Sequence, residues 1–515
     1  MPSLRDDLAE GADELRETHI SWVFLRGHEV FKVKKPVSLG FLDFTTLDKR
    51  KKACEAEVEL NARSSPDVYL GLVPVTRDAS GRHRLGGEGE TVDWAVHMRR
   101  LRDGDRADSR LAEGTLSVAQ VDAIASYVAA FHARCRADEE TSRFGSVEAI
   151  AVNVRENFAQ TRAVIAEHLS PAEAAEIEEW QLSFLRGHEP LFEARRRRGR
   201  VRDGHGDLRL EHVYFESGEV RVIDCIEFNE RFRYADVCAD LAFLSMDLAW
   251  HGRVDLAERL LATYARDTGD FDLYPLVDFY ESYRAYVRGK VATFLLAAKD
   301  LAHDARERAA KEARRYFLLA LAAERAPVVP PVVIAVGGLL ASGKSTISDR
   351  LGALLGAPHV NSDRVRKQLL GAQPTERLYE GAWSGAYDPK LTEQVYAECY
   401  RAARVVVSSG RPVILDASFR SPEMRAAARA VAAELGVPFR FVEGRLDPAI
   451  CRVRLKERDM TTSISDGRLE IFDDFLKKWQ PPNELDPEEH VVVDTSRAIE
   501  ESLATLRARI PSWSP

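Results

Sequence analysis

The spacing of apolar and polar residues divides the chain into two parts. Near the N-terminus, I-S-W-V-F-L-R-G and E-V-F-K-V-K-K-P-V are rich in β-branched and aromatic residues, and Gly-His separates them, which predicts a β-hairpin. Helical spacing follows at 47–62, and again at 117–134 and 147–187. The stretch V-R-V-I-D-C-I-E-F predicts a pair of strands, and residues 234–325 predict helices almost throughout. The first part is therefore expected to combine a strand-rich start with a large helical region.

A proline-rich stretch, A-P-V-V-P-P at 326–331, ends the helical region. After it, the short apolar runs V-V-I-A-V, P-V-I-L-D, F-R-F-V-E and V-V-V-D alternate with amphipathic helices, and several of the runs end in an acid. This alternation is typical of a parallel sheet with crossover helices. We therefore expect two domains, residues 1–327 and 328–515, of which the second belongs to the α/β class.

Composition narrows the classes of function. The chain has 515 residues, 45% of them hydrophobic and 30% charged, which is usual for a folded, water-soluble protein. A formal net charge of −9 argues against nonspecific binding to nucleic acid or to a membrane surface. The basic run at 195–200 is interpreted as a solvated turn, with a positive rim for an anionic substrate as the alternative. The sequence carries no signal for an oligomeric state.

Cysteine usage and the apolar stretches bear on location. The six cysteines show neither a CxxC pair nor a metal-ligand spacing, so we expect reduced residues that serve in packing. The N-terminal M-P-S-L-R-D-D-L-A-E has no apolar core, and a secretory signal is not expected. The most apolar stretch, V-V-P-P-V-V-I-A-V-G-G-L-L, is too short and too interrupted to span a bilayer. These features indicate the cytoplasm.

Residues 338–345, G-L-L-A-S-G-K-S, match the pattern G-x-x-x-x-G-K-[ST] of a phosphate-binding loop. Glycines let the backbone N–H groups face the phosphates, Lys344 reaches the terminal phosphates, and the Ser345 hydroxyl can bind Mg²⁺. A predicted strand precedes the loop and a predicted helix follows it, so the positive end of that helix faces the same anion. The expected nucleotide-binding residues are Gly338, Ser342, Gly343, Lys344, Ser345 and Thr346.

Further polar residues follow the P-loop. In N-S-D-R-V-R-K, Asp363 is expected to end a strand, and Asp416 closes P-V-I-L-D at the carboxyl edge of the sheet, where ligands bind in such folds. Arg454 and Arg458 are four residues apart and share one face of a predicted helix. By spacing alone this face would be solvated, but close to a triphosphate arginines neutralise charge during transfer.

Residues 332–480 resemble the small P-loop kinases related to zeta toxins, gluconate kinases and polynucleotide kinases. The resemblance implies a three-layer α/β/α domain that uses ATP and Mg²⁺. It also implies that Asp363 takes the proton of the acceptor hydroxyl and that Asp416 lies near the Mg²⁺. Arg454 or Arg458 would then be an arginine of the lid.

The first part carries a second phosphate-transfer motif. The stretch H-G-D-L-R-L-E-H-V at 205–213 resembles the catalytic loop of aminoglycoside phosphotransferases and, more distantly, of protein kinases. The resemblance covers about residues 18–325 and implies a bilobal domain with an N-lobe of about 1–100 and a helical C-lobe of about 101–327. It makes Asp207 the catalytic base. Arg209 stands where protein kinases place a phosphate-contacting lysine.

The resemblance also implies a metal site and a lysine strand. Asp224 corresponds to the metal-binding aspartate, and Glu227 adds a second carboxylate that could hold Mg²⁺. In V-F-K-V-K-K, alternation places Lys32 and Lys34 on one face of a strand. Lys32 is the first choice for the phosphate contact and Lys34 the alternate, with Glu57 as their partner. The competing interpretation is an exposed, charged edge strand.

His212 departs from the family pattern, which has an asparagine that binds Mg²⁺ at this position. Imidazole is a softer ligand, better suited to Zn or Cu. Three interpretations remain open: one metal held by Asp224 and Glu227, a histidine that orients Asp207, or a degraded pseudokinase. No glycine-rich loop that would cover phosphates is evident at 21–27.

Two further features belong to the predicted helical lobe. The resemblance implies that Asp236 is a structural brace of the catalytic loop. Arg284 and Arg288 share a helix face, where they line either an acceptor pocket or a surface stripe.

The motifs together predict an ATP-dependent phosphotransferase with two ATP and Mg²⁺ sites. Its acceptor is expected to be a hydroxyl group of a small molecule, such as a sugar, an aminoglycoside-like compound or a nucleoside. One alternative keeps a single active half and makes the other a regulatory pseudokinase. A different class also remains open, namely a nucleotide-switched binding protein or toxin-like effector.

Overall fold

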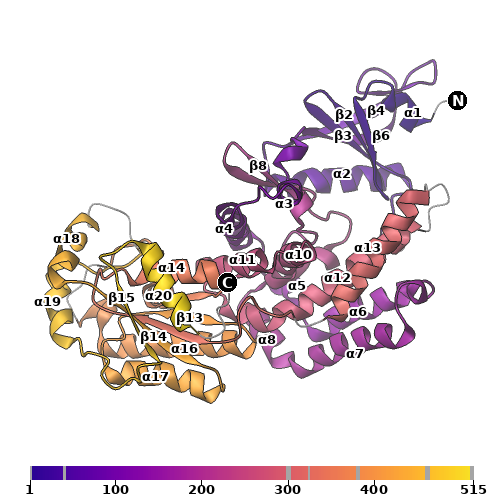
Figure 1. Ribbon diagram of the computed structural model, residues 1–515. Coiled ribbons are helices and arrows are strands. Elements are labelled where there is room, and N and C mark those ends of the chain that lie inside the picture. Colours follow the sequence, from indigo (N-terminus) through magenta and orange to yellow (C-terminus); the bar gives the residue numbers. More distant parts are fainter. Residues whose placement is uncertain are drawn as a thin grey trace. The chain divides into compact units, whose positions relative to one another are not determined.

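The computed structural model describes residues 3–38, 42–296, 303–322, 325–378, 383–458 and 464–510 (Figure 1). The chain forms two compact units. The first consists of residues 1–252 and 278–324, and the second of residues 253–277 and 325–515. The sequence pattern predicted one boundary near residue 328, so the position of 253–277 in the second unit differs from that prediction.

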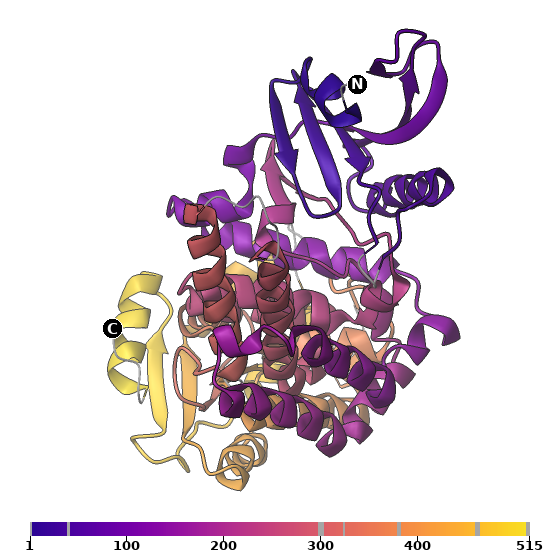
Figure 2. The same ribbon diagram turned by 90° about the vertical axis from the view of Figure 1, so that its right-hand side faces the viewer.

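A six-stranded antiparallel sheet begins the first unit, with the order β1-β2-β3-β6-β4-β5. The predicted hairpin is confirmed: β2 and β3 are joined by Gly27 and His28, and Gly27 has φ +57°, as tight hairpin turns require. The predicted helix at 47–62 is α2, which packs against β4 and β6 (Figure 2). The elements are α1 (Leu4–Ala9), β1 (Glu14–Glu17), β2 (Ser21–Arg26), β3 (Glu29–Lys34), α2 (Leu47–Ala62), β4 (Tyr69–Arg77), β5 (His83–Leu85) and β6 (Glu90–Arg99).

Helices make up most of the rest of the first unit, as predicted. They are η1 (Asp103–Asp105), α3 (Ala107–Ala112), α4 (Val118–Arg134), α5 (Glu139–Arg143), α6 (Val147–Thr161), η2 (Ile165–Glu167), α7 (Pro171–Gly187), α8 (Glu189–Arg197), η3 (Leu210–His212), α9 (Glu230–Arg233), α10 (Val237–Trp250), α12 (Tyr274–Leu296, of which 274–277 belong to the second unit) and α13 (His303–Leu321). Several of these helices begin with a side-chain cap; at α4 the Ser117 and Gln120 side chains each accept from the other's backbone N–H.

Two short antiparallel sheets of two strands each lie beside the segment with the second phosphate-transfer motif. They pair β7 (Val201–Asp203) with β10 (Tyr234–Asp236), and β8 (Val213–Glu216) with β9 (Glu219–Val222). The sequence predicted a strand pair over 220–228, but β9 ends at Val222 and the following residues have no regular structure. Asp224 lies in this irregular stretch with φ +66°, a left-handed conformation that a strand cannot contain.

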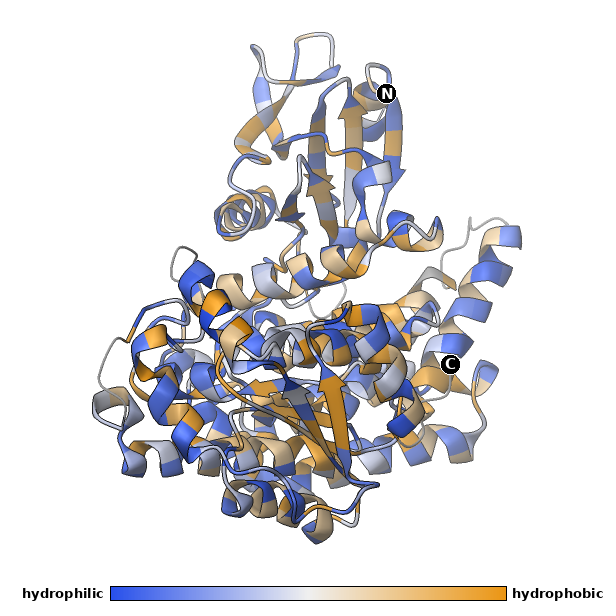
Figure 3. Cartoon of the chain, turned by 60° about the vertical axis from the view of Figure 1, so that its left-hand side comes forward, coloured by the Kyte–Doolittle hydropathy of each residue, from blue (hydrophilic) through white to orange (hydrophobic). Residues whose placement is uncertain are grey.

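The second unit contains the predicted parallel sheet, in the order β12-β13-β11-β14-β15. Four strands match the predicted apolar runs, and their hydrophobic residues are seen in Figure 3. Every residue of β11 and β13 is buried, as expected for strands covered on both faces. The strands are β11 (Val333–Gly337), β12 (His359–Asn361), β13 (Val413–Asp416), β14 (Phe439–Arg445) and β15 (His490–Asp494). Asp363 was expected to end a strand, but β12 ends at Asn361 and Asp363 lies in the first turn of the next helix.

Helices cover both faces of this sheet. α14 and α20 contribute to one apolar core with β11, β13, β14 and β15, while α16 and α17 pack together against other positions of the sheet. The helices are α11 (Val254–Thr268), η4 (Phe271–Leu273), α14 (Lys344–Leu355), α15 (Ser362–Leu369), η5 (Gly385–Tyr387), α16 (Pro389–Ser408), α17 (Pro422–Glu434), α18 (Pro448–Arg458), α19 (Leu469–Lys478) and α20 (Ile499–Arg509).

Helix α11 belongs to this unit although residues 278–324 of the first unit separate it from the rest of the unit in the sequence. It packs against α14 and β12. On α11, the carboxylate of Glu258 is fully buried and accepts hydrogen bonds from Arg411 Nε at 3.1 Å and from Arg325 Nη2 at 2.7 Å. Charged groups this deep in a protein are retained only when they are paired. The ion pairs therefore explain why 253–277 is part of the second unit.

Two predictions about the whole chain can be compared with the structure. All six cysteines are buried, which agrees with the predicted role in packing, and none forms a disulfide in the described part of the chain. None of the helices in the described ranges combines the length and the apolar character that crossing a bilayer needs.

Candidate functional site

The loop between β11 and α14 holds two glycines in conformations that other residues rarely adopt. Gly338 has φ +140° and Gly343 has φ +84°. A Cβ atom on Gly338 would lie 2.6 Å from the carbonyl oxygen of Gly444 and 2.7 Å from Ser342 Oγ. A larger residue therefore cannot occupy position 338 unless the loop moves away from the end of β14.

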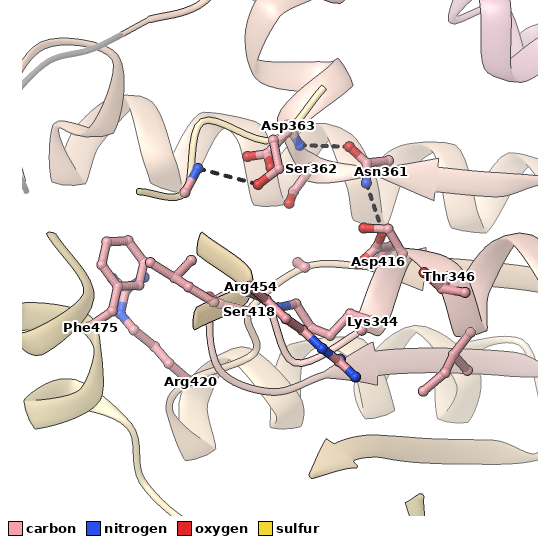
Figure 4. A pocket seen from close by; sticks show the side chains of 18 of the residues that line it. Lys344, Thr346, Asn361, Ser362, Asp363, Asp416, Ser418, Arg420, Arg454 and Phe475 are labelled. Carbon is pink, nitrogen blue, oxygen red and sulfur yellow. Dashed lines mark hydrogen bonds between the residues drawn. The ribbon is translucent and has the colours of Figure 1, made fainter. Parts of the chain in front are cut away.

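This loop forms one wall of a cavity of about 500 Å³ (Figure 4). Lys344 and Ser345 begin α14 and line the cavity with Thr346. The ammonium of Lys344 donates to the carbonyl of Leu339 at 2.6 Å. Burial lowers the pKa of Lys344, while the charges of Asp416 and Asp363 act in the opposite direction. The lysine is thus held inside the curl of the loop and faces two carboxylates.

Asp416 ends β13 and lies beside the start of α14. Its Oδ2 contacts His359 Nε2 at 3.1 Å and accepts from Asn361 Nδ2 at 2.7 Å. Burial would raise the pKa of Asp416, but the hydrogen bond and charge of His359, the charge of Lys344 and a hydrogen bond from Ser345 outweigh it, so the pKa lies below its usual value. Asp416 is therefore an anion next to the Ser345 hydroxyl.

His359 on β12 was not predicted as a site residue. Its Nδ1 contacts Asp349 Oδ1 at 3.0 Å while its Nε2 contacts Asp416. Burial opposes the charged form, but the hydrogen bonds to both carboxylates raise the pKa of His359 to about 9. In the sequence, His359 is marked only by its position two residues before Asn361. Strand β12 has three residues, too few to be recognised in the sequence as a strand that pairs with β13.

Asp363 reaches the same cavity from α15 (Figure 4). Asn361 caps this helix, because its Oδ1 accepts from the backbone N–H groups of Asp363 and Arg364, both at 3.0 Å. Burial raises the pKa of Asp363, against the charge of Arg366, which lowers it. Burial thus raises the proton affinity of this carboxylate, which suits a group that accepts a proton.

The two predicted arginines also reach the cavity. From α18, Arg454 Nη2 donates to the carbonyl of Thr495 at 2.9 Å, and Arg458 Nη2 donates to the carbonyl of Gly467 at 2.7 Å. Both side chains line the cavity together with the P-loop. Their position agrees with the prediction that both arginines lie on one helix face near the P-loop. The alternative, a solvated helix surface, does not describe them.

The residues around the loop fit a nucleoside triphosphate and Mg²⁺. Ser342 Oγ is buried and has no hydrogen-bond partner, and the glycine loop leaves no room for side chains on its inner side. The Ser345 hydroxyl and the Asp416 carboxylate supply the hard oxygen atoms that Mg²⁺ prefers. The start of α14 adds backbone N–H groups that favour an anion.

In the first unit, the two predicted lysines lie on β3 and share Glu57 of α2. Lys32 Nζ is 2.9 Å from Glu57 Oε1 and 2.5 Å from Asp224 Oδ1. Lys34 forms ion pairs with Glu57 and with Glu227, and its side chain is fully buried. The alternative of an exposed edge strand is wrong, because β3 lies between β2 and β6.

These ion pairs differ from the expected metal site. Asp224 and Glu227 were predicted to hold one Mg²⁺ together; in the structure each carboxylate faces a lysine, and the metal site stays a prediction. Burial would raise the pKa of Asp224, but Lys32 and His212 hold it well below its usual value. Among the described residues, no group of three or more His, Cys, Asp or Glu side chains could hold a metal ion.

Asp240, rather than Asp236, braces the loop that carries Asp207. The Asp240 carboxylate accepts from the backbone N–H groups of His205 at 2.8 Å and Gly206 at 2.9 Å. Asp236 instead caps α10 and pairs with Arg195, at 2.5 Å from Nε. The prediction for Asp236 was therefore wrong. The solvated-turn interpretation of the basic run holds for only part of it, because Arg195 is fully buried while Arg197 and Arg198 are exposed.

His212 lies between the two predicted catalytic acids. Its Nδ1 hydrogen-bonds the carbonyl of Asp207 at 2.8 Å, so Nδ1 carries the proton, and its Nε2 is 3.6 Å from Asp224 Oδ2. Arg209 is buried, forms an ion pair with Glu211 and has Asp247 at 3.8 Å. It therefore does not extend into an open phosphate site as predicted.

Arg284 and Arg288, predicted to line either an acceptor pocket or a surface stripe, have different surroundings. Arg284 is buried and donates to the carbonyl of Ala239 at 3.2 Å, so it belongs to neither. Arg288 acts on Asp207: burial would raise the pKa of this carboxyl, but the charges of His212, Arg209 and Arg288 keep it below its usual value.

Comparison with known proteins gives the following likenesses. A gluconokinase from Sinorhizobium meliloti has a TM-score of 0.26 and 19% identity, covering 35% of this chain and 90% of that one. A choline/ethanolamine kinase family protein from Mesorhizobium loti has a TM-score of 0.36 and 14% identity, covering 62% of this chain and 97% of that one. The AAA domain family AAA_33 matches residues 333–482, the part that holds the P-loop, Asp363, Asp416 and the two arginines.

Curated relatives match most of the chain. The uncharacterized protein Rv2004c of Mycobacterium tuberculosis (strain ATCC 25618 / H37Rv) is 36% identical over 421 residues, which cover 82% of this chain and 81% of the relative. The uncharacterized protein Mb2027c of Mycobacterium bovis (strain ATCC BAA-935 / AF2122/97) matches with the same identity and coverage. This chain therefore belongs to the same protein family as these mycobacterial relatives and contains a P-loop domain of the AAA_33 family in its C-terminal part.

Proposed function

We propose that the chain is an ATP-dependent phosphotransferase and that its P-loop unit transfers the terminal phosphoryl group of ATP to a hydroxyl group of a small molecule. The observation that carries this proposal is the cavity that the P-loop shares with Asp363. A carboxylate of raised pKa in the same cavity as the phosphate-binding lysine gives the acceptor hydroxyl a base beside the phosphate.

Each residue of the cavity has a defined part in this reaction. Asp363 accepts the proton of the acceptor hydroxyl, whose oxygen then bonds to the phosphorus as the bond to the leaving oxygen of ADP breaks. Lys344, Arg454 and Arg458 bind the phosphate oxygens and offset their negative charge. Ser345 and Asp416 would hold Mg²⁺, which when bound neutralises charge on the phosphates.

His359 and Asn361 would orient the carboxylate of Asp416 in this site. Both contact the same oxygen, Oδ2, so the other carboxylate oxygen is left for Ser345 and the metal. Ligands of a metal ion are usually held by such outer hydrogen bonds.

For the first unit, the ion pairs favour the alternative with one active half. Lys32 and Lys34, which would contact phosphate, are paired with Asp224 and Glu227, which would hold the metal. ATP would have to displace Lys32 from Asp224, whose side chain is 42% exposed, and Mg²⁺ would have to displace Lys34 from Glu227 in a buried ion pair, which is costly. We therefore assign phosphoryl transfer to the P-loop unit and a regulatory or binding role to the kinase-like first unit.

Three single variants of the full chain test this assignment with ATP and a panel of small hydroxyl compounds. Lys344→Ala and Asp363→Asn are expected to lose transfer, while Asp207→Asn keeps it. Loss of transfer in Asp207→Asn alone would move the reaction to the first unit. ATP hydrolysis that no hydroxyl compound stimulates, and that Asp363→Asn leaves unchanged, would instead support a nucleotide-switched protein without an acceptor.

A further inference from the structure

The cavity extends beyond the P-loop to a second group of basic and aromatic residues. Trp383 and Phe475 stack with ring centroids 4.7 Å apart, and the guanidinium of Arg420 lies 4.6 Å from the Trp383 ring centroid. Lys478 Nζ is 3.8 Å from the same ring. Figure 4 shows Arg420 and Phe475 on the far side of Lys344 from Thr346. The rings thus hold Arg420 in place, because cations bind favourably against aromatic faces.

A second arginine comes from α15, one turn after Asp363. Arg366 is 4% exposed and lies 4.5 Å from the Tyr387 ring centroid. Its Nη1 donates to the carbonyl of Ala386 at 2.5 Å, but its Nε is buried and has no hydrogen-bond partner. A buried guanidinium N–H without an acceptor is costly, so this position favours a bound acceptor atom.

In the part of the chain that the structure describes, neither arginine forms an ion pair with a carboxylate. Within the described ranges, no ion pair joins Arg366 or Arg420 to an acid, although both line the cavity. Burial lowers the pKa of Arg420, and the charge of Arg366 lowers it further, so the two like charges influence each other. The charge of Arg366 acts on Asp363, but among the described residues no ion pair joins the two, so an anion can bind to both guanidinium groups.

These cations are distinct from the ones that the nucleotide needs. The P-loop side of the cavity has Lys344, Arg454 and Arg458 for the phosphates. Arg366 and Arg420 instead contact the aromatic residues of η5 and α19 and their neighbours, and Arg366 is on the same helix as the proposed base, Asp363. They are therefore placed to bind the acceptor and not the leaving nucleotide.

We infer that Arg366 and Arg420 bind an anionic group of the acceptor, a phosphate or a carboxylate, while an acceptor hydroxyl faces Asp363. This inference rests on the proposed function and deepens it, because it selects among the expected acceptors. Neutral sugars lack the group that the two arginines require. Cationic amino sugars, including aminoglycoside-like compounds, are disfavoured in this cavity by repulsion from both guanidinium groups.

Four probes with one carbon skeleton test the inference by binding alone. Glucose 6-phosphate, gluconate, glucose and glucosamine carry a phosphate, a carboxylate, no charge and an ammonium group. Their dissociation constants are measured by calorimetry on the full chain, with Mg²⁺ and a non-hydrolysable ATP analogue present. We expect at least one anionic probe to bind about tenfold or more tightly than glucose, and glucosamine to bind more weakly than glucose.

Variants then assign the preference to the two arginines. Arg420→Gln is expected to reduce the preference for the anionic probe about tenfold while the affinity for the ATP analogue stays unchanged. Arg366→Gln tests the second guanidinium, and Arg420→Lys, which keeps the charge, should retain part of the preference. The matched control is Arg404→Gln, since Arg404 pairs with Glu434 in the same unit and does not line the cavity.

The outcomes separate this inference from the proposed function. Similar affinities for all four probes, or no binding of any of them, would overturn the inference, as would an anion preference that survives Arg420→Gln. An anion preference that depends on Arg420, together with a lack of phosphoryl transfer to the bound probe, would uphold the site while contradicting the proposed transfer to it. If the inference holds, the anionic probe with the lower dissociation constant, glucose 6-phosphate or gluconate, shows whether the acceptor carries a phosphate or a carboxylate.

Discussion

Substitution of His205 tests how the segment that carries Asp207 is held. His205 is fully buried: its Nδ1 accepts from the backbone N–H of Asp207 at 3.3 Å, and its Nε2 donates to the carbonyl of Ile223 at 3.0 Å. Burial lowers the pKa of His205 from 6.5 to about 4. The ring is therefore neutral in the folded chain under mildly acidic conditions that protonate it in the unfolded chain.

The sign and size of the effect follow from this difference. Above pH 6.5 the ring is neutral in both states, so it causes no pH dependence. Between pH 6.5 and about 4 only the unfolded chain takes up the proton, and the free energy of unfolding falls as the pH falls. One pKa unit corresponds to about 1.4 kcal/mol, so this histidine accounts for about 3 kcal/mol of stability lost by pH 4.

The variant His205→Asn removes the titrating ring. We expect it to lower stability by about 1–3 kcal/mol at pH 7.5, because it breaks buried hydrogen bonds, but to remove about 3 kcal/mol of the acid-dependent loss. Urea unfolding of the full chain at pH 7.5, 5.5 and 4.5 measures this, with hydrogen exchange of peptides from α10 reporting on the first unit.

A control distinguishes loss of the titration from general destabilisation. Cys225→Ala removes a buried side chain from the same region and no group that titrates between pH 4 and 7, so it should lower stability equally at each pH. An unchanged pH dependence in His205→Asn, parallel to that of the wild type, would refute the assignment of the acid sensitivity to this ring.

Three further changes address the ion-pair network, the P-loop and the proposed base. Lys34→Met leaves the buried carboxylates of Glu57 and Glu227 with less positive charge and should cost about 3–5 kcal/mol in urea unfolding; adding Glu227→Gln should restore part of this, and no recovery would contradict a direct pair. Gly338→Ala places a Cβ 2.6 Å from a carbonyl oxygen, so ATP affinity by calorimetry should fall at least about tenfold, and wild-type affinity would disprove the close approach. The transfer rate should rise with pH as Asp363 ionises, with a midpoint above the usual 3.8 because burial raises this pKa; a midpoint at or below that value would exclude Asp363 as the base.

Local features of the chain were predictable because their signals lie close together in the sequence. The P-loop residues from Gly338 to Ser345 form one contiguous motif, and α2 begins and ends at the predicted residues. The four long apolar runs of the second unit became strands of the predicted parallel sheet. In each case a few neighbouring residues determine the local structure, so a single sequence is sufficient to recognise it.

Features that depend on distant parts of the chain were missed or misplaced. Asp236 and Asp240 both lie at the start of α10, and only the fold determines that Asp240 meets the backbone of His205 and Gly206. The charge network of Lys34 and Glu227 joins residues about 190 positions apart, so the sequence could identify the carboxylate but not its partner. Metal ligation and ion pairing use the same residue types, and the sequence cannot separate them.

The cavity shows the same limit. Arg420 follows β13 and Trp383 precedes η5, and neither lies in a motif with a recognisable spacing. Their proximity results from the folding of several crossover connections over one end of the sheet. Asp363 was predicted only by resemblance to known kinases, and its place in α15 required the structure.

The chain passes from one unit to the other three times, after Gly252, Val277 and Glu324. The P-loop unit is thus encoded by two separate stretches of the gene, and a fragment that starts at the prolines lacks α11 and its buried Glu258. Such a fragment would expose the face of α14 that α11 covers, and it should be less soluble than one to which residues 253–277 are joined. A single crossover that transfers both stretches of this unit also transfers residues 278–324 of the first unit, which lie between them.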